Sequence, residues 1–377
     1  MTQPQRRFFT SESVSEGHPD KVCDQISDAI LDACLAADPF SRVACEVLAT
    51  TDTVIISGEI TTKASLDYEA IVRRVVKEIG YVHPGSGFDA ESLQVLQFID
   101  TQSPDIALGV DNLGAGDQGM VFGYACRETP EYMPSAIMFS HKILQQAARL
   151  RKEREVPFLQ PDAKAQVTLL YEDQNPIAIE TVVVSHQHTE EVSQKELTEF
   201  IKERVIKPAL LPTGLLLPST TYLINPTGRF VLGGPAGDTG LTGRKIIVDT
   251  YGGASRHGGG AFSGKDPTKV DRSGAYMARL VAKNLVEWNV CTRCELQISY
   301  AIGVKQPVSI YVDTFGTGIM EDSKIEKLVK QEFDFSPSGI IKSLDLLRPI
   351  YQAHMNYGHF GKPGVPWEQV LPKPASL

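Results

Sequence analysis

Hydrophobic and polar positions in this chain follow two different periods, and one order of these periods occurs three times. In the first copy, Val22, Ile26 and Ile30 recur at the spacing of an α-helix. Strict alternation of apolar and polar side chains follows, as expected for strands with one buried face. This copy predicts a helix over 19–38, strands over 43–48 and 54–60, and a helix over 67–79.

The same helix, hairpin, helix order returns twice. The second copy predicts a helix over 135–151, strands over 165–171 and 176–184, and a helix over 193–205 with Ser193 as N-cap. The third predicts a helix over 273–288, strands over 295–304 and 308–314, and a helix over 322–333. Each copy offers a sheet with one apolar face and helices to cover it. We therefore predict an α+β protein of three similar α/β sandwich domains related by pseudo-threefold symmetry, over residues 7–104, 119–231 and 232–370.

Two segments follow neither period: 103–119, and 225–270, which is rich in glycine and punctuated by charged residues. Loops on a rigid scaffold often carry function, so both are candidate ligand-binding segments. Residues 105–118 contain many turn formers and a short apolar stretch, 106–110, too small for a core of its own. We predict an active-site lid there, the alternative being a fixed surface connection.

Composition excludes several classes of protein. Apolar residues make up 42% and charged residues 22% of the 377, which is typical of a folded globular chain. The formal net charge of -9 argues against a nucleic-acid partner, and no apolar run reaches the length of a membrane helix. No secretory signal is recognisable, so we expect a cytoplasmic protein. Cys291 and Cys294 have a metal or redox spacing, but no second such pair accompanies them, which favours packing.

Two glycine-rich motifs approach known nucleotide-binding patterns without satisfying them. Residues 114–119 match GxGxxG, but the pattern needs a following helix, and 120–124 has the character of a strand. Residues 259–266 miss the P-loop pattern by one position, because Asp266 replaces the hydroxyl that binds magnesium. We reject both folds, although backbone N–H groups freed by glycine can still cradle phosphate beside Lys265.

Cations gather in segment 225–270 of this otherwise acidic chain. Arg244, Lys245, Lys265 and Lys269 could form a local funnel for a polyphosphate, the alternative being a solvated basic face. Hard oxygen ligands for magnesium are offered by Asp20, Asp238, Asp249, Asp266 and Asp271. His18 precedes Pro19 at the start of the first helix, where an anion would be favoured, and we expect His18 and Lys21 to point toward it. A surface histidine at a helix cap is the alternative.

Five stretches of this chain together resemble the S-adenosylmethionine synthetase (methionine adenosyltransferase) family. They are 9–21 (FTSESVSEGHPDK), 114–119 (GAGDQG), 225–230 (NPTGRF), 238–245 (DTGLTGRK) and 258–266 (GGGAFSGKD), and the similarity extends from about Phe8 to about Trp367. The resemblance implies three α+β domains related by a pseudo-threefold, in agreement with the repeat. It also implies ATP and L-methionine as substrates, and a homotetramer, built as a dimer of dimers, with active sites between subunits. Hydrolysis of the triphosphate to pyrophosphate and phosphate would follow.

The resemblance further implies roles by position. ATP would be bound by His18, Asp162, Lys164, Arg229, Phe230, Asp238, Arg244, Lys245, Ala261 and Lys265, among which His18, Lys164, Arg244, Lys245 and Lys265 would be catalytic. Methionine would be bound by Glu59, Gln102, Asp238 and Lys269, to which the chemistry discussed below adds Asp117. Two magnesium ions per site would be bound through Asp20 and Asp271, and potassium through Glu46. One departure is the loop over the active site, which is usually longer in the family than residues 102–112 here.

The chemistry of such a site requires no general base, because a thioether sulfur carries its lone pair at every pH. The difficulty of the reaction lies in the departure of triphosphate as a highly charged anion. We therefore expect catalysis by in-line positioning and by electrostatic stabilisation of this leaving group. His18 would serve the bridging oxygen at C5′, and Asp117 and Asp238 would lie near the sulfonium and the methionine amine. Two other classes remain open from sequence: a nucleotide-binding sensor without the chemistry, and a P-loop-like phosphotransferase.

Overall fold

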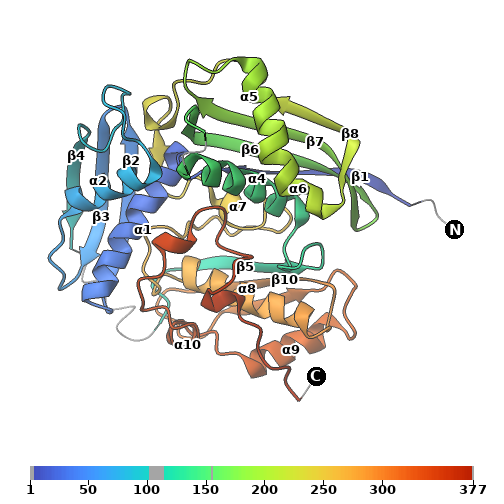
Figure 1. Ribbon diagram of the computed structural model, residues 1–377. Coiled ribbons are helices and arrows are strands. Elements are labelled where there is room, and N and C mark those ends of the chain that lie inside the picture. Colours follow the sequence, from blue (N-terminus) through green and yellow to red (C-terminus); the bar gives the residue numbers. More distant parts are fainter. Residues whose placement is uncertain (1–3, 102–113, 154–155, 376–377) are drawn as a thin grey trace.

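The strands form three sheets in a computed structural model that describes residues 4–101, 114–153 and 156–375 (Figure 1). One sheet has the order β4 (Gln94–Asp100), β3 (Thr53–Thr61), β2 (Arg42–Thr50) and β9 (Gly240–Leu241). Another has the order β1 (Arg6–Val14), β6 (Leu159–Glu172), β7 (Asn175–His188) and β8 (Leu216–Ile224). The remaining sheet has the order β11 (Ser309–Asp313), β10 (Arg293–Tyr300) and β5 (Gly119–Cys126).

Helices flank each hairpin in the chain as the three predicted copies require. The first hairpin lies between α1 (Pro19–Ala37) and α2 (Tyr68–Ile79); the second between α4 (Ser135–Lys152) and α5 (Gln194–Phe200), which continues through the π-helical η1 (Ile201–Ile206) into α6 (Lys207–Leu210). The third lies between α8 (Val270–Glu287) and α9 (Asp322–Glu332), followed by α10 (Pro337–Ser343). The predicted α+β architecture of three similar units is confirmed, and Figure 1 shows them around the middle of the molecule in blue, green and orange.

All three sheets follow one plan. Each contains an antiparallel hairpin (β2 with β3, β6 with β7, β10 with β11), and in the two four-stranded sheets a parallel strand lies beside its second strand (β4 beside β3, β8 beside β7). The first strand of each hairpin also pairs antiparallel with a strand from a distant part of the chain: β9 with β2, β1 with β6, and β5 with β10. The units thus exchange strands in a cycle. The predicted boundaries near 104, 119 and 231 therefore divide the sequence but not the sheets, and they stay a sequence prediction.

Local signals explain where the helices start and stop. His18 caps α1 and Pro19 occupies its first turn, as predicted from the sequence. Ser193 and Glu196 form a reciprocal capping box at the start of α5. Helix α2 is followed by the C-cap residue Gly80, whose φ of 112° is easily adopted by glycine.

Helix α1 has an acidic row as well as an apolar face. Asp20, Asp24, Asp28 and Asp32 are spaced four residues apart, so they lie along one side of the helix. We call these four residues the α1 acidic row. Each of them accepts backbone N–H groups from a segment in the last 140 or so residues of the chain, namely from Leu241, Gly243, Gly264, and the pair Tyr351 and Gln352. The row therefore attaches the glycine-rich loops to the first unit.

Other expectations have mixed outcomes. Gln102 and residues 105–113 of the predicted lid lie outside the described residues. Residues 120–124 form part of β5, so the motif 114–119 precedes a strand, as predicted.

The six cysteines are buried and free, Cys291 and Cys294 included. Among the helices of the described ranges, none is both long and apolar enough to cross a membrane.

Candidate active site

The N-terminus of α1 carries the first group of candidate residues. His18 is buried, and its Nδ1 accepts the backbone N–H of Asp20 at 3.2 Å. Burial and the nearby charges of Lys245 and Lys164 lower the pKa of His18 to about 3, so the ring is neutral at pH 7. Because Nδ1 is an acceptor, the single ring proton belongs on Nε2, which is left as a hydrogen-bond donor.

Asp20 joins the helix to the loop that contains Lys245. Its Oδ2 is paired with Lys245 Nζ, and its Oδ1 accepts the N–H of Leu241 at 2.9 Å. Burial alone would raise the pKa of Asp20, but the hydrogen bonds from Lys245 and Leu241 hold it below its usual value. Asp20 is thus a carboxylate at neutral pH, already paired with a cation.

Asp162 of β6 brings an unsatisfied acceptor to this group. Its Oδ2 accepts the N–H of Gly234 at 2.8 Å, whereas its buried Oδ1 has no hydrogen-bond partner among the residues that the structure describes. Burial raises the pKa of Asp162 to about 6, and the charges of Lys164, Asp238 and Asp20 act on it as well. An orphaned buried acceptor next to glycine backbone is suited to a ligand that donates a hydrogen bond. His18, Asp20, Asp162, Lys164, Asp238 and Lys245 are called the His18 group below.

A second group surrounds Lys265. Residues 264–266 run antiparallel along β2, where the N–H of Cys45 donates to Gly264 and the N–H of Asp266 donates to Val43. Lys265 Nζ lies 2.7 Å from Asp271 Oδ2, at the start of α8. Lys269 is paired with Asp266 at 2.5 Å. This arrangement places two cations and Asp271 beside the edge of β2.

Glu46 and Glu59 belong to the same region. Both lie on the outward-facing side of the hairpin formed by β2 and β3. Desolvation raises the pKa of Glu46, which Lys265 opposes and Glu59 reinforces. Together with Lys265, Lys269 and Asp271, these two residues form what we call the Lys265 group.

The two groups lie at different places on the protomer. Asp20 belongs to the His18 group, whereas Asp28, which accepts the N–H of Gly264, lies eight residues further along α1, about 12 Å away. Their loops come close at Gly243 and Ala261, where a Cβ on Gly243 would lie 2.5 Å from that of Ala261. Across the described ranges, no hydrogen bond or ion pair joins a side chain of one group to a side chain of the other.

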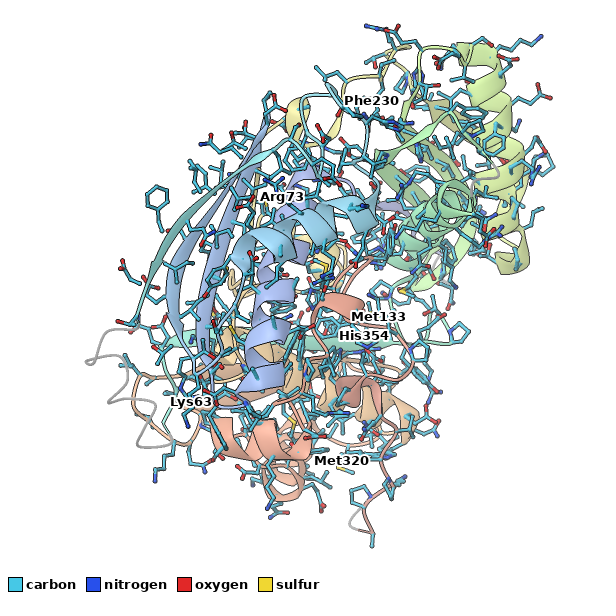
Figure 2. The ribbon with its side chains drawn as sticks, turned by 60° about the vertical axis from the view of Figure 1, so that its left-hand side comes forward. Lys63, Arg73, Met133, Phe230, Met320 and His354 are labelled. Carbon is cyan, nitrogen blue, oxygen red and sulfur yellow. The ribbon has the colours of Figure 1, made fainter. Side chains whose placement is uncertain are left out.

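The remaining predicted residues lie nearer the surface. Exposed Arg229 is paired with Glu190, and Phe230, labelled near the upper end of the molecule in Figure 2, donates its N–H to His188 Nε2 at 3.1 Å. Arg244 is exposed, and so is Asp117, whose Oδ1 accepts the N–H of Gln118 at 2.7 Å.

Lys21 does not point toward a ligand, contrary to the expectation from the sequence. It is fully buried, with Nζ paired with Asp249 and 3.2 Å from Asp24 Oδ2. These carboxylates raise the pKa of Lys21 against the effect of burial. Lys21 and Asp249 are therefore parts of the interior that supports the helix end, and Asp249 is not available to a metal.

A magnesium site can be tested against these residues. No cluster of three or more His, Cys, Asp or Glu side chains able to hold a metal occurs in the described part of the chain. Magnesium, however, usually binds through one or two carboxylates together with substrate phosphates. Asp20 and Asp271 fit that mode, since each is a carboxylate paired with a lysine that a phosphate could attract away.

Three α+β units support glycine-rich loops on which lysines are paired with carboxylates. This arrangement is typical of an α+β enzyme that acts on a charged substrate through electrostatic stabilisation. The chain belongs to the S-adenosylmethionine synthetase family. Models of the family's N-terminal, central and C-terminal domains match residues 6–104, 112–230 and 232–369. The S-adenosylmethionine synthase of Treponema denticola is 60% identical over 371 residues, covering 96% of this chain and 95% of the relative. That of Treponema pallidum is 56% identical over 371 residues, covering 96% and 94%.

Two buried aspartates of α1 were missed by the sequence analysis. Asp24 and Asp28 were not among the predicted residues, although they accept hydrogen bonds from the two glycine-rich loops at Gly243 and Gly264. The sequence feature that could have identified them is the four-residue spacing of aspartates on a helix otherwise rich in apolar residues.

Proposed function

We propose that the His18 and Lys265 groups carry out the reaction of the family, the synthesis of S-adenosylmethionine from ATP and L-methionine. The methionine sulfur attacks the ribose C5′, the C5′–O bond breaks, and triphosphate leaves. The observation that supports the assignment is that Lys245 is paired with Asp20 and Lys265 with Asp271, so that each pair offers a cation for phosphate and a carboxylate for a metal ion. The function itself follows from the family to which the chain belongs.

The residues act through position and charge. His18 Nε2, the free donor of a neutral ring, would donate to the oxygen that leaves C5′. Lys164, Arg244, Lys245 and Lys265 would neutralise the phosphate chain, and Asp162 would accept a hydrogen bond from ATP through its free Oδ1. No residue has to remove a proton, because sulfur reacts through its lone pair. The same cations would serve the hydrolysis of triphosphate to pyrophosphate and phosphate.

Members of the family generally depend on magnesium and potassium. In this chain Asp20 and Asp271 would hold magnesium, two ions per site, and Glu46 would hold potassium. Bound magnesium would supply charge stabilisation of the phosphate oxygens. Glu59, Asp117, Asp238 and Lys269 would surround methionine, with Gln102 outside the described residues.

We further propose that each active site combines the His18 group of one chain with the Lys265 group of another, within a homotetramer. Two observations support this. The side chains of the two groups are not joined within the described part of one protomer. In addition, α1 and α2 lie on one side of the sheet β4-β3-β2-β9 (Figure 2), while Glu46, Glu59 and the 62% exposed Phe98 are accessible on its strands. A sheet surface that exposes apolar side chains is suited to contact with a second copy.

A product assay tests the proposed function against the other two classes. The protein is incubated with ATP, methionine, magnesium and potassium, and with each component omitted in turn. S-Adenosylmethionine formed together with pyrophosphate and phosphate is the expected result. Nucleotide binding without turnover would indicate a sensor, and transfer of phosphate to an acceptor would indicate a phosphotransferase.

A further inference from the structure

Two cations assigned to the phosphate chain follow glycines of the same conformation. Gly243, with φ of 77°, precedes Arg244, and Gly264, with φ of 79°, precedes Lys265. This left-handed conformation is easy for glycine and strained for other residues. It turns the chain directly before each cation, so the way each glycine is held determines the direction in which the cation leaves its loop.

Both glycines are held by α1. The N–H of Gly243 donates to Asp24 Oδ1 at 2.8 Å, and the N–H of Gly264 donates to Asp28 Oδ1 at 2.9 Å. Asp24 and Asp28 are fully buried and are separated by about one helical turn, roughly 6 Å along the axis. One rigid helix therefore fixes the spacing of the two loops.

The two carboxylates are themselves fixed by buried cations. Arg272 donates to both oxygens of Asp28 at 2.7 Å. Lys21 Nζ lies 3.2 Å from the second oxygen of Asp24. The bidentate Arg272 makes Asp28 a charge-assisted acceptor, whereas burial raises the pKa of Asp24 to about 7 against the charge of Lys21. Each glycine is thus attached to a buried carboxyl group of α1 instead of to water.

We propose that Asp24 and Asp28 are positioning residues for adenosyl transfer: they hold Gly243 and Gly264 so that Arg244 and Lys265 meet the triphosphate. The inference rests on the proposed roles of Arg244 and Lys265. Both aspartates are fully buried, so they act through the geometry of a loop and not through contact with a substrate. Displacing a catalytic group by about 1 Å can reduce the rate about 100-fold.

The α1 acidic row contains its own control. Asp32 lies in the same row and also accepts backbone N–H groups, from Tyr351 at 3.0 Å and from Gln352 at 2.8 Å. Those residues belong to neither glycine-rich loop. A change at Asp32 therefore removes a comparable backbone attachment from a segment that contains neither Arg244 nor Lys265.

The test compares Asp24→Leu with Asp24→Asn. Both remove the charge at similar volume, but only asparagine keeps an acceptor for the N–H of Gly243. We expect kcat to fall about 100-fold in Asp24→Leu, and less than about 10-fold in Asp24→Asn, with the methionine KM changed much less than kcat. Asp32→Leu and Asp32→Asn are expected to keep the parental kcat.

Hydrogen exchange provides a structural readout of the same variants. Asp24→Leu should speed amide exchange in residues 240–246 and leave 351–356 unchanged, whereas Asp32→Leu should do the reverse. For the second loop, Asp28→Ala should speed exchange in 258–268, and Asp28→Asn, which keeps one acceptor oxygen for the N–H of Gly264 and Arg272 Nη1, should do so less. Should Asp24→Leu not fold, Asp24→Ala replaces it with the same expected readouts.

Parental kcat in a folded Asp24→Leu variant would overturn the proposal, and so would an equal loss in Asp24→Asn. Failure of the proposed function gives a different result. In that case the unaltered protein would form no S-adenosylmethionine, or Arg244→Ala would keep the parental kcat.

Discussion

At the scale of single residues, the side chains proposed to contact a ligand were easier to predict from the sequence than the buried side chains that hold the loops in place. His18, Asp20 and Lys245 form one connected group, and all three belong to motifs identified in the sequence. Lys21 belongs to the same motif, yet it is buried against Asp249, because residue type and spacing do not reveal which side of a helix end faces the interior. Burial depends on tertiary packing, which a local motif does not contain.

His18→Ala should fold and lose most of the adenosyl transfer while keeping more of the triphosphate hydrolysis. Its proposed hydrogen bond forms only while the C5′–O bond breaks, so it stabilises that transition state alone. Single-turnover rates for both steps provide the measurement. An equal loss of both activities would argue against this role.

Asp20→Asn and Asp271→Asn should raise the magnesium concentration needed for half-maximal activity more than they raise the methionine KM. A neutral amide is a poorer ligand for a hard cation than a carboxylate. Magnesium titrations of both variants can be compared with Asp52→Asn, a change in the exposed turn between β2 and β3. Titration curves that coincide with that of the control would remove both residues from the metal site.

Stability should fall in mild acid through buried histidines such as His186. Burial, reinforced by Arg151, lowers its pKa from 6.5 to about 4. Between these values the unfolded chain binds a proton that the folded chain excludes, so stability is present above pH 6.5 and is lost toward pH 4, at about 1.4 kcal/mol per pH unit at most.

The corresponding experiment compares chemical unfolding at pH 7 and pH 5. His186→Asn should lose less stability than the parent over this interval, because one proton-linked group has been removed. His83→Asn, at an exposed position, should behave as the parent does. Equal losses in the parent and in His186→Asn would contradict the assignment.

At the scale of elements, periodicity predicted the three hairpins and their flanking helices, but not the strands exchanged between units. The segment of β1 was noted for its motif alone, and β9 is two residues long, too short for any period. β5 was recognised as a strand, yet its partner β10 lies more than 150 residues away in the sequence. Local patterns identify strands, whereas pairing is decided by the packing of whole units.

The contact between β5 and α8 gives a prediction at this scale. A Cβ on Gly123 would lie 2.0 Å from the backbone carbon of Ala278, so the strand and the helix must separate to accept it. Gly123→Ala should therefore destabilise the fold by about 1–3 kcal/mol or more. Gly85→Ala, where no atom lies within 4 Å, isolates the strain of a positive φ alone, about 1–2 kcal/mol.

The midpoints of thermal unfolding of Gly123→Ala and Gly85→Ala provide the measurement. A lower midpoint for Gly123→Ala than for Gly85→Ala is expected. The reverse order would show that β5 is not closely packed on α8.

At the scale of the whole molecule, the repeat in the sequence accounts for the threefold plan, while the arrangement of the active site depends on assembly. One protomer presents the His18 group and the Lys265 group at different places, and each contains one proposed magnesium ligand. We expect neither group to support the reaction alone. Activity should therefore require association of two chains.

Complementation between two inactive variants tests this most directly. His18→Ala and Lys265→Ala are produced separately and are also co-expressed at equal levels. If each site combines the two groups from different chains, half of the randomly formed dimers are mixed, and each mixed dimer has one intact site of two. The co-expressed sample should then recover about a quarter of the parental rate of S-adenosylmethionine formation. Activity no greater than the mean of the two separate variants would contradict a site shared between chains.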